Sequence, residues 1–326
     1  MSKIVNIGTT HSGKTCYFYG MLEQMLTGCK GFSLQIKNKK QYNELMFGIE
    51  RLADDERPVE ERWPQQTTEK ETFDMVLRYN FKKLDDLEWV DYPGEFVKTQ
   101  DEGFLDALEG ADCLLICVDG ALLANATEDN LDAIVRKFRN KCGLSLNAAL
   151  WEAAEKNGDR LPPVCILFTK YDVVNQEMKN REILTKFLRK AFPVLMGEDE
   201  NNRTNCMVTY CPVSLGKDIA NGGMLDPRNV EKPICFANYL VQLNLLKQLS
   251  RDANAKISAS SAKVAEYNKK GFFGKMFASK PKPLSEEQKE AIMAAANAQK
   301  NNLADLLAVI DQLPLFINGQ EENWYK

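Results

Sequence analysis

Residues 8–15, with the sequence GTTHSGKT, constrain the fold of this chain more than any other stretch. They fit the pattern G-x-x-x-x-G-K-[ST] and lie between a short apolar strand expected at residues 3–7 and a helix expected at residues 14–26. Gly8 and Gly13 allow the tight backbone turn that leads a strand directly into a helix. The stretch therefore predicts a strand, a loop and a helix in succession, which is a building unit of α/β proteins.

The remaining hydrophobic pattern extends this unit into an α/β fold. Continuous apolar runs, typical of central strands covered on both faces, occur at residues 113–118, 164–168 and 207–211. Further strands are expected at residues 32–36, 73–81 and 87–90, and helices at residues 41–52, 101–109, 128–156 and 179–195. Strands that alternate with helices predict a mostly parallel central sheet flanked by helices.

The character of the chain changes after Pro233. Two long helices are expected at residues 236–267 and 285–313, and Ser285 with Gln288 has the pattern of a capping box. We therefore predict one domain at residues 1–250, with a helical insertion at about 38–54, and a C-terminal α-helical hairpin extension at residues 251–326.

The glycine-rich loop is suited to binding phosphate. Its backbone N–H groups are expected to point into a concavity at the N-terminus of a helix, where anions are stabilised. Lys14 is placed to bridge the β- and γ-phosphates of a nucleotide, and the Thr15 hydroxyl is placed to ligate Mg²⁺. The nucleotide-binding residues expected in this loop are Gly8, Thr10, His11, Ser12, Gly13, Lys14, Thr15 and Cys16.

A second motif, DYPGE, begins at the tip of the predicted strand 87–90. Asp91 can hold Mg²⁺ there through a water molecule, and the Gly94 N–H can donate a hydrogen bond to a γ-phosphate. Taken alone, the same letters also describe a strand that ends in a common Pro-Gly turn.

Two further motifs follow buried strands and indicate a guanine base. In FTKYD the expected binding residues are Thr169, Lys170 and Asp172. The Asp172 carboxylate can accept hydrogen bonds from guanine N1–H and N2–H₂, a donor pair that adenine lacks, and the stem of Lys170 can cover the base. In CPVSLGK the backbone at Ser214 and Leu215 can reach guanine O6. Taken singly, Asp172 also fits a helix N-cap, and Ser214 also fits a turn.

All four motifs follow predicted strands, in the order that places them at the carboxyl edge of one sheet, where open α/β sheets bind ligands. With GTTHSGKT, DYPG, TKYD and VSL as G1, G3, G4 and G5 motifs, roughly residues 1–250 resemble the Ras-like G domain of P-loop GTPases of the TRAFAC class. DYPGE is also similar to the bacterial YcjX-like and double-GTPase families. The resemblance implies binding of GTP and GDP, dependence on Mg²⁺, and two switch segments at residues 58–68 and 92–103.

The threonine that completes the Mg²⁺ shell in such proteins has two candidates here. Thr67 and Thr68 both precede the amphipathic strand, and Thr67 is slightly favoured because Pro64 and Gln65 set up an extended approach. Arg62 is expected to be a solvated loop residue rather than a source of positive charge for catalysis.

Two departures from the family pattern predict slow hydrolysis. Glu95 stands where Ras-like proteins have the glutamine that orients the attacking water, and a carboxylate beside a triphosphate is repelled unless a cation offsets it. Thr10 can crowd the attacking water, whereas His11 is expected to point outward. The catalytic residues that the resemblance implies are Lys14, Thr67, Gly94 and Glu95.

Composition sets limits on partners and location. A net charge of -4 and a pI of about 5.4 argue against general nucleic-acid binding. No apolar run reaches the roughly 18 residues that span a bilayer. Nine cysteines without C-x-x-C pairing indicate reduced thiols, and the N-terminus does not have the pattern of a signal peptide. We therefore expect a cytoplasmic protein.

The connection between the two long helices combines phenylalanines with lysines. Phe272, Phe273 and Phe277 stand among several lysines between residues 269 and 282. We expect these rings to pack against the protein itself. The alternatives are a groove on a partner protein and an anionic membrane surface, which would make the protein a peripheral membrane protein.

The sequence thus predicts a guanine-nucleotide-binding molecular switch that hydrolyses GTP slowly with Mg²⁺ and relays its nucleotide state to an effector or regulator protein. One alternative is a GTPase that assembles, or remodels membranes, in response to GTP. Another is a nucleotide-binding pseudo-GTPase that acts as an interaction protein.

Overall fold

The structure is a computed structural model that describes residues 1–99, 102–197, 203–269 and 282–325. The chain forms two compact units, one of Met1–Ala237 with Val309–Lys326 and the other of Asn238–Ala308. The predicted division, which assigned residues 251–326 to one C-terminal extension, differs from this one because the chain returns to the first unit at Val309.

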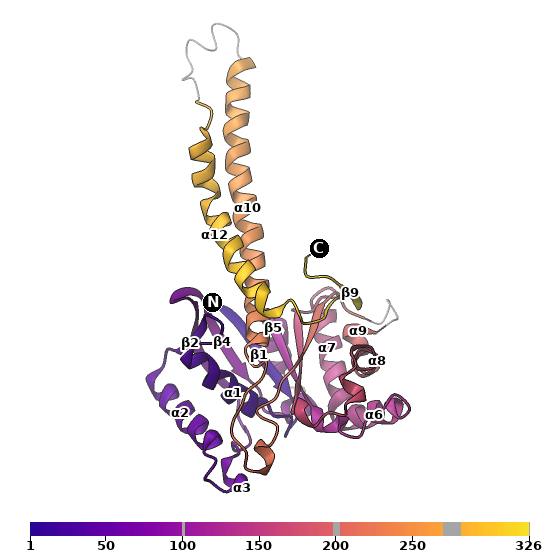
Figure 1. Cartoon of the computed structure of the whole chain (residues 1–326). Helices are drawn as coiled ribbons and strands as arrows, with labels where there is room; N and C mark the ends of the chain where they lie inside the picture. Colours follow the sequence, from indigo (N-terminus) through magenta and orange to yellow (C-terminus); the bar gives the residue numbers. More distant parts are fainter. Residues whose placement is uncertain (100–101, 198–202, 270–281, 326) are drawn as a thin grey trace. The chain divides into compact units, whose positions relative to one another are not determined.

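In the described part of the chain, nine strands of the first unit form one sheet in the order β2-β3-β4-β1-β5-β6-β7-β8-β9 (Figure 1). Strands β4, β1, β5, β6 and β7 are mutually parallel, and antiparallel strands extend the sheet on both sides. The strands are β1 Ser2–Gly8, β2 Phe32–Ile36, β3 Glu71–Tyr79, β4 Lys82–Asp91, β5 Cys113–Asp119, β6 Val164–Thr169, β7 Met207–Pro212, β8 Leu315–Ile317 and β9 Gln320–Glu322.

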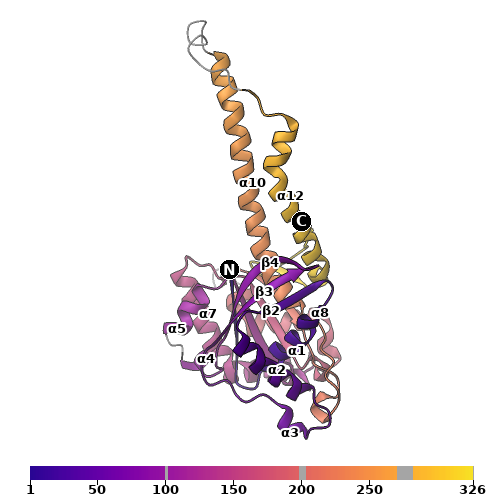
Figure 2. The same cartoon turned by 90° about the vertical axis from the view of Figure 1, so that its left-hand side faces the viewer.

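Helices flank this sheet on both faces, α1 and α2 on one and the group from α5 to α9 on the other (Figures 1 and 2). They are α1 Lys14–Thr27, α2 Lys39–Ala53, α3 Val59–Arg62, α4 Phe96–Thr99, α5 Glu102–Glu109, α6 Leu131–Phe138, α7 Leu144–Lys156, α8 Arg181–Ala191 and α9 Pro193–Met196. The predicted fold class is confirmed. The prediction of a single helix at residues 128–156 is wrong in one respect. The segment is divided into α6 and α7 by a π-helical stretch, Arg139–Gly143.

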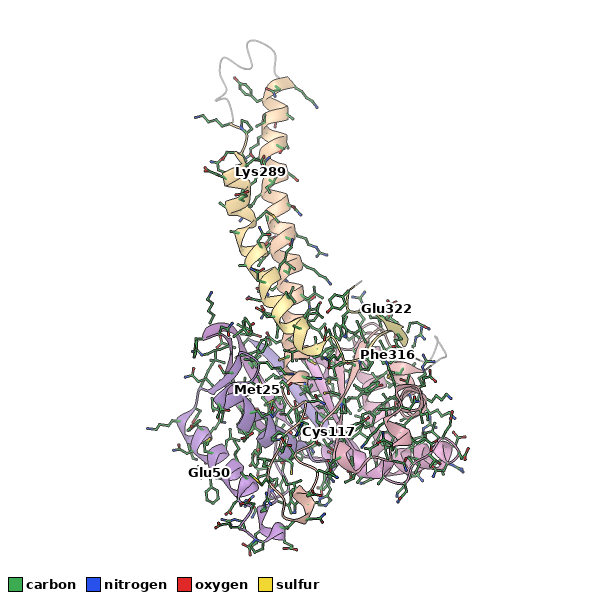
Figure 3. The ribbon with its side chains drawn as sticks, in the orientation of Figure 1. Met25, Glu50, Cys117, Lys289, Phe316 and Glu322 are labelled. Carbon is green, nitrogen blue, oxygen red and sulfur yellow. The ribbon has the colours of Figure 1, made fainter. Side chains whose placement is uncertain are left out.

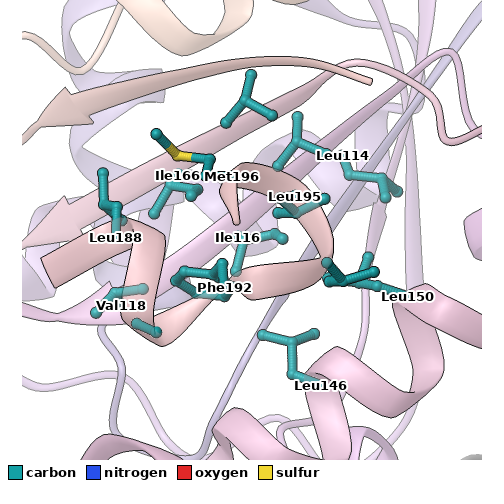
Figure 4. Close-up of a cluster of buried hydrophobic side chains, with 14 of the residues drawn as sticks. Leu114, Ile116, Val118, Leu146, Leu150, Ile166, Leu188, Phe192, Leu195 and Met196 are labelled. Carbon is teal, nitrogen blue, oxygen red and sulfur yellow. The ribbon is translucent and has the colours of Figure 1, made fainter. Parts of the chain in front are cut away.

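The core explains why the central strands are apolar throughout. Leu114, Ile116 and Val118 of β5 pack with Leu150 of α7 in one large cluster of buried side chains (Figure 4). The residues between them on β5 point to the opposite face of the sheet, and Cys117 there contacts the Asn6 side chain. Because both faces are buried, the strands are held rigidly, and their carboxyl ends form a fixed platform for the loops that follow them.

Strands β3 and β4 form a hairpin. The predicted strand 73–81 ends at Tyr79, and Asn80 and Phe81 form the turn with φ angles of 45° and 67°. Two consecutive residues with positive φ are the mark of the type I′ turn, whose twist matches that of the flanking strands. Phe81 is 93% exposed, although it continues the alternation of apolar residues that predicted the strand at 73–81. Its position in that alternation therefore does not correspond to a buried side chain.

A second hairpin at the C-terminus was not predicted. Strand β8 pairs with β7 in antiparallel fashion, and β9 pairs with β8. Asn318 and Gly319 form the turn with φ angles of 49° and 72°, and Phe316 is buried in the core (Figure 3). The prediction that the helical extension continues to residue 326 is therefore wrong for these residues.

In its described residues, the second unit consists of two long helices that lie side by side. They belong to α10, Lys232–Lys269, and α12, Glu286–Ile310. Within this unit the buried side chains of Gln242 and Gln299 are hydrogen-bonded to each other. The capping box is confirmed, because the Gln288 N–H donates to Ser285 Oγ at 3.2 Å and the Ser285 N–H donates to Gln288 Oε1 at 3.0 Å.

Residues 270–281 lie outside the described residues, and with them the predicted cluster of Phe272, Phe273 and Phe277. Lys269 and Lys282, which flank this stretch, are exposed. None of the described helices has the combination of length and apolar content that crossing a bilayer requires.

Candidate functional site

A cavity of about 530 Å³ lies at the carboxyl ends of β1, β6 and β7. Volumes of this size are typical of small-molecule sites. Its walls come from the loops that follow these strands and from the segment that precedes β3. The predicted site residues that line it are Thr10, His11, Ser12, Gly13, Lys14, Thr15, Cys16, Thr67, Gly94, Thr169, Lys170, Asp172, Ser214 and Leu215.

The loop between β1 and α1 presents its backbone to this cavity. Gly13 adopts a φ of 81° and is the N-cap of α1. A Cβ atom at Gly8 would lie 2.7 Å from the Cys117 carbonyl oxygen, so glycine is required there although Gly8 does not line the cavity. His11 also has a positive φ, 65°, and its side chain is exposed. The first turn of α1 therefore opens onto the cavity, as an anion-binding helix N-terminus does.

Lys14 adds positive charge to this helix N-terminus. Its buried Nζ donates a hydrogen bond to the Gly8 carbonyl at 3.1 Å, which holds the ammonium group inside the loop. The first turn of α1, which is fully described, contains no acidic residue. An anion in the cavity would therefore meet the positive end of the helix dipole and a lysine ammonium group together.

Thr15 and Thr67 come from distant parts of the sequence and meet at one end of the cavity. Their hydroxyl oxygens lie 3.2 Å apart. Neighbouring oxygen ligands of an octahedral Mg²⁺ ion lie about 3.0 Å apart, because each Mg–O distance is about 2.1 Å. The spacing of the two hydroxyls therefore fits a shared Mg²⁺ ion. Thr68, the other predicted candidate, is exposed and is not part of the described cavity lining.

Asp91 lies behind these hydroxyls and does not line the cavity directly. It is 3% exposed, and Asn6 donates a hydrogen bond to its Oδ1 at 2.9 Å. Burial raises the pKa of the Asp91 carboxyl to about 7, although the charge of Lys14 and a hydrogen bond from Thr67 act in the opposite direction. A nearby divalent cation would favour the charged form. This position suits a carboxylate that holds Mg²⁺ through water.

The hydroxyl and carboxylate oxygens near Thr15 and Thr67 suit Mg²⁺ better than a metal ion that takes all of its ligands from the protein. Among the described residues there is no group of three or more His, Cys, Asp or Glu side chains that could hold a metal ion. Mg²⁺ usually keeps several waters and binds through one or two protein groups plus substrate phosphates. Two hydroxyls and one carboxylate behind them match that requirement.

Gly94 is packed against the loop between β1 and α1. A Cβ atom there would overlap the backbone nitrogen of Thr10, so no larger residue fits this position. Its neighbour Glu95 has an exposed side chain and is not part of the described cavity lining. The structure thus brings Gly94 to the part of the cavity beside Thr10 and leaves Glu95 outside the described lining.

The turn after β6 is hydrogen-bonded to the loop between β1 and α1. Thr169 Oγ1 donates to the Ser12 carbonyl at 2.6 Å, and Lys170 Nζ donates to the His11 carbonyl at 3.0 Å. The Lys170 backbone takes a φ of 50°, which directs the chain into the short 3₁₀ helix η3, Tyr171–Val173. This helix places the half-buried Asp172 in the cavity wall, and partial burial raises the pKa of its carboxyl.

The loop after β7 forms the last wall. The backbone of Ser214 was predicted to bind the ligand, but both of its polar groups already have partners. Its N–H donates to the Arg228 carbonyl at 3.3 Å, and its carbonyl accepts from the Arg228 N–H at 2.8 Å. The Leu215 N–H is therefore the better placed donor for a ligand. The Leu215 side chain packs against Gly20 of α1, where a Cβ atom would overlap it.

The sequence analysis did not identify two residues that support the site, the acidic residue Asp119 and the amide residue Asn6. Asp119 ends β5 and forms an ion pair with Lys170 at 3.1 Å. Asn6 lies inside β1 and orients Asp91. An acidic residue directly after the apolar run 113–118 was a usable signal for Asp119, whereas Asn6 carried none beyond being a polar residue within an apolar strand.

Arg62 is not the solvated residue that the sequence led us to expect. Its side chain is 1% exposed, and it does not line the described cavity. Its guanidinium group donates to the carbonyl oxygens of Leu52 and Gly223. The expectation is wrong because these acceptors are backbone atoms, which a sequence does not reveal.

The first unit is thus a mixed, mostly parallel sheet flanked by helices, with a glycine loop between β1 and α1. No protein-family model matches the chain, and no curated protein matches it. It is similar to the signal recognition particle receptor SRb-GTP/SRX complex from Chaetomium thermophilum, at 15% identity over 66% of this chain and 90% of that chain, with a TM-score of 0.37.

Two further solved structures are similar to the chain. One is the small COPII coat GTPase SAR1 from Encephalitozoon cuniculi in complex with GDP, at 12% identity over 76% of this chain and 82% of that one, with a TM-score of 0.33. The other is the S. cerevisiae Ski7 GTPase-like domain bound to GTP, at 16% identity over 67% and 44%, with a TM-score of 0.38. Because these TM-scores are low, we interpret the site from its own geometry.

Proposed function

We propose that the cavity binds a guanine nucleotide with Mg²⁺ and that the protein is a molecular switch that hydrolyses GTP slowly. One observation carries the proposal. Groups suited to phosphate, to Mg²⁺ and to guanine, namely Lys14, the Thr15–Thr67 pair and Asp172, surround a single cavity although they are far apart in the sequence.

At the phosphate end, the α1 N-terminus and Lys14 would hold the β- and γ-phosphates. Thr15 and Thr67 would ligate Mg²⁺, with Asp91 behind them. When bound, Mg²⁺ neutralises charge that develops on the phosphate oxygens during in-line attack by water. Gly94, beside Thr10, would donate its N–H to the γ-phosphate and so sense its presence.

At the other end, Asp172 would accept from guanine N1–H and N2–H₂. The hydrogen bond from Lys170 to the His11 carbonyl ties this recognition turn to the phosphate loop. Base and phosphates would therefore be held at a fixed separation. Adenine would leave the half-buried Asp172 carboxylate without its donor pair, which is costly.

Slow hydrolysis follows from what the cavity wall lacks. The basic side chains among its described lining residues are His11, Lys14 and Lys170, and the ammonium groups of the two lysines are hydrogen-bonded to the loop backbone. Glu95 lies outside the lining. We therefore expect unassisted turnover on the order of 10⁻⁴ to 10⁻² per second, with faster turnover only when a partner supplies a charge.

In this proposal the switch segments, residues 58–68 and 92–103, report the nucleotide state to a partner protein in the cytoplasm. Residues 63–67 line the cavity, and Gly94 touches the phosphate loop, so both segments are in contact with the ligand position. A nucleotide-binding protein without turnover is the second candidate function, which the exposed position of Glu95 favours. Release of phosphate from GTP in a single-turnover assay separates the two.

Binding of fluorescent mant-GTP with Mg²⁺ to nucleotide-free protein tests the proposal. Wild type should bind, and Lys14→Ala should lower the affinity roughly a hundredfold, because a buried cation facing the phosphates is lost. Lys40→Ala is the matched control, since Lys40 is an exposed lysine of α2 that pairs with Glu44. Absence of binding to wild type, or equal affinity of Lys14→Ala, would refute the proposal.

A further inference from the structure

Residues 63–67 belong to the segment that connects α3 to β3, and they form one wall of the cavity. We call these five residues the strap. The last strap residue, Thr67, contacts Thr15 through hydroxyl oxygens 3.2 Å apart. This end lies at the position that the proposed function assigns to Mg²⁺ and the γ-phosphate. The other end of the strap begins at Trp63, directly after Arg62, and is fixed by different means.

Arg62 anchors that end through three hydrogen bonds. Its Nε and Nη2 donate to the Leu52 carbonyl at 3.1 and 2.9 Å, and its Nη1 donates to the Gly223 carbonyl at 2.9 Å. The side chain is 1% exposed and is among the largest fully buried side chains of the described structure. The positive charge is thus held by backbone dipoles from two other segments of the first unit.

The two acceptors tie the strap to different structures. Leu52 lies in the last turn of α2, where helix carbonyls attract a cation. Gly223 follows the 3₁₀ helix η6, Ile219–Asn221, which contributes two residues to the cavity wall. Figures 1 and 2 show α3 beside this loop. Arg62 therefore joins the strap to the base end of the cavity as well as to α2.

The hydrogen bonds of the Arg62 guanidinium group should break only rarely in the folded protein. Enclosing a guanidinium group costs free energy that its hydrogen bonds must offset, and loss of any acceptor would leave a buried unpaired charge. Its acceptors are protein carbonyls, so the anchor requires neither a γ-phosphate nor a metal ion. Thr67, at the other end of the strap, instead lies beside Thr15 at the proposed metal position.

We propose that Arg62 is a positioning residue that holds the strap closed over the nucleotide in both the GDP and the GTP state and thereby slows nucleotide release. The moving part of the first switch is then the stretch after Arg62, and residues 54–62 stay in place. This inference rests on the proposed nucleotide-binding function.

Release of mant-GDP from the full-length protein into excess GDP tests this role. Arg62→Gln, which cannot make all three hydrogen bonds, should release mant-GDP roughly tenfold faster or more than wild type. Trp63→Ala, which removes a half-buried wall residue but leaves the anchor, should also release it faster. Thr67→Ala should instead accelerate release mainly for a Mg²⁺-bound, non-hydrolysable GTP analogue.

Arg57→Gln is the matched control, because Arg57 belongs to the same segment but pairs with Asp54 at 3.3 Å and does not line the described cavity. It should release mant-GDP at the wild-type rate. Wild-type release by Arg62→Gln would overturn the proposal, whatever the rate of Trp63→Ala.

Amide hydrogen exchange of the nucleotide-free protein separates this role from the proposed function. Arg62→Gln should speed exchange at residues 59–66 and leave exchange in the central strands unchanged, which also verifies that the variant folds. Unchanged exchange at residues 59–66 would overturn the anchor. Failure of wild type to bind mant-GDP would refute the proposed function, and the exchange result would still decide the role of Arg62.

Discussion

Single residues at the site owe their chemistry to how deeply they are buried. Asp91 is enclosed beneath the hydroxyls of Thr15 and Thr67, whereas Asp172 is half-buried at the other end of the cavity. In both cases burial raises the pKa of the carboxyl, by more for Asp91. The two carboxyls are therefore suited to different ligands, a cation for one and paired N–H donors for the other.

The raised pKa of Asp91 predicts how the stability of the metal-free, nucleotide-free protein changes with pH. The folded pKa of about 7 lies above the ordinary value of 3.8, so the folded state binds more protons between these values. The free energy of unfolding should therefore fall as pH rises from 4 to 7, by at most about 4 kcal/mol from this group. Denaturation by urea at several pH values measures it.

Asp91→Asn is the control for that experiment, because asparagine stays neutral and keeps an oxygen for the hydrogen bond from Asn6. The difference in free energy of unfolding between wild type and variant should shift in favour of the variant as pH rises from 4 to 7. A difference that does not change with pH would show that Asp91 titrates normally.

At this scale, several residues that line the cavity could be predicted from the sequence, whereas the residues that support them could not. Thr15, Gly94 and Asp172 were expected from local motifs, and all three line the cavity. Arg62 was misjudged, because its partners are carbonyls of Leu52 and Gly223, which only the folded chain brings to it.

Among the secondary-structure elements, long apolar strands were the easiest to predict. Strands β5, β6 and β7 are covered on both faces, so their sequences are almost entirely apolar, with one buried polar residue, Thr209, in the middle of β7. Strands β8 and β9 have three residues each, too few for a periodic pattern. The Asn-Gly pair between them was the available signal, because both residues adopt the positive φ of a type I′ turn.

The C-terminal hairpin should contribute to the stability of the first unit. Phe316 of β8 is 0% exposed and belongs to the main core, whereas its neighbour Ile317 is 38% exposed. Phe316→Ala should lower the free energy of unfolding by about 3–5 kcal/mol, and Ile317→Ala, the control in the same strand, by less than about 1 kcal/mol. Urea denaturation measures both, and equal small losses would mean that β8 does not pack as described.

At the scale of the whole molecule, we predicted from the sequence a part that contains the sheet and a helical part, with the boundary between them at residue 250. The structure assigns Asn238–Ala308 to the second unit and returns the final residues to the first. The boundary falls inside α10, and a continuous helix shows no break in its sequence pattern at such a point. All the described residues of the cavity belong to the first unit, so the proposed function resides there.

The preference for guanine over adenine is the central claim, and calorimetric titration of nucleotide-free protein with GDP and with ADP, each with Mg²⁺, tests it most directly. We predict that GDP binds at least about a hundredfold more tightly, because only guanine offers Asp172 two donors. Asp172→Asn should weaken GDP binding and improve binding of xanthosine diphosphate, whose O2 accepts from the asparagine amide. Equal affinities of wild type for GDP and ADP would contradict the account.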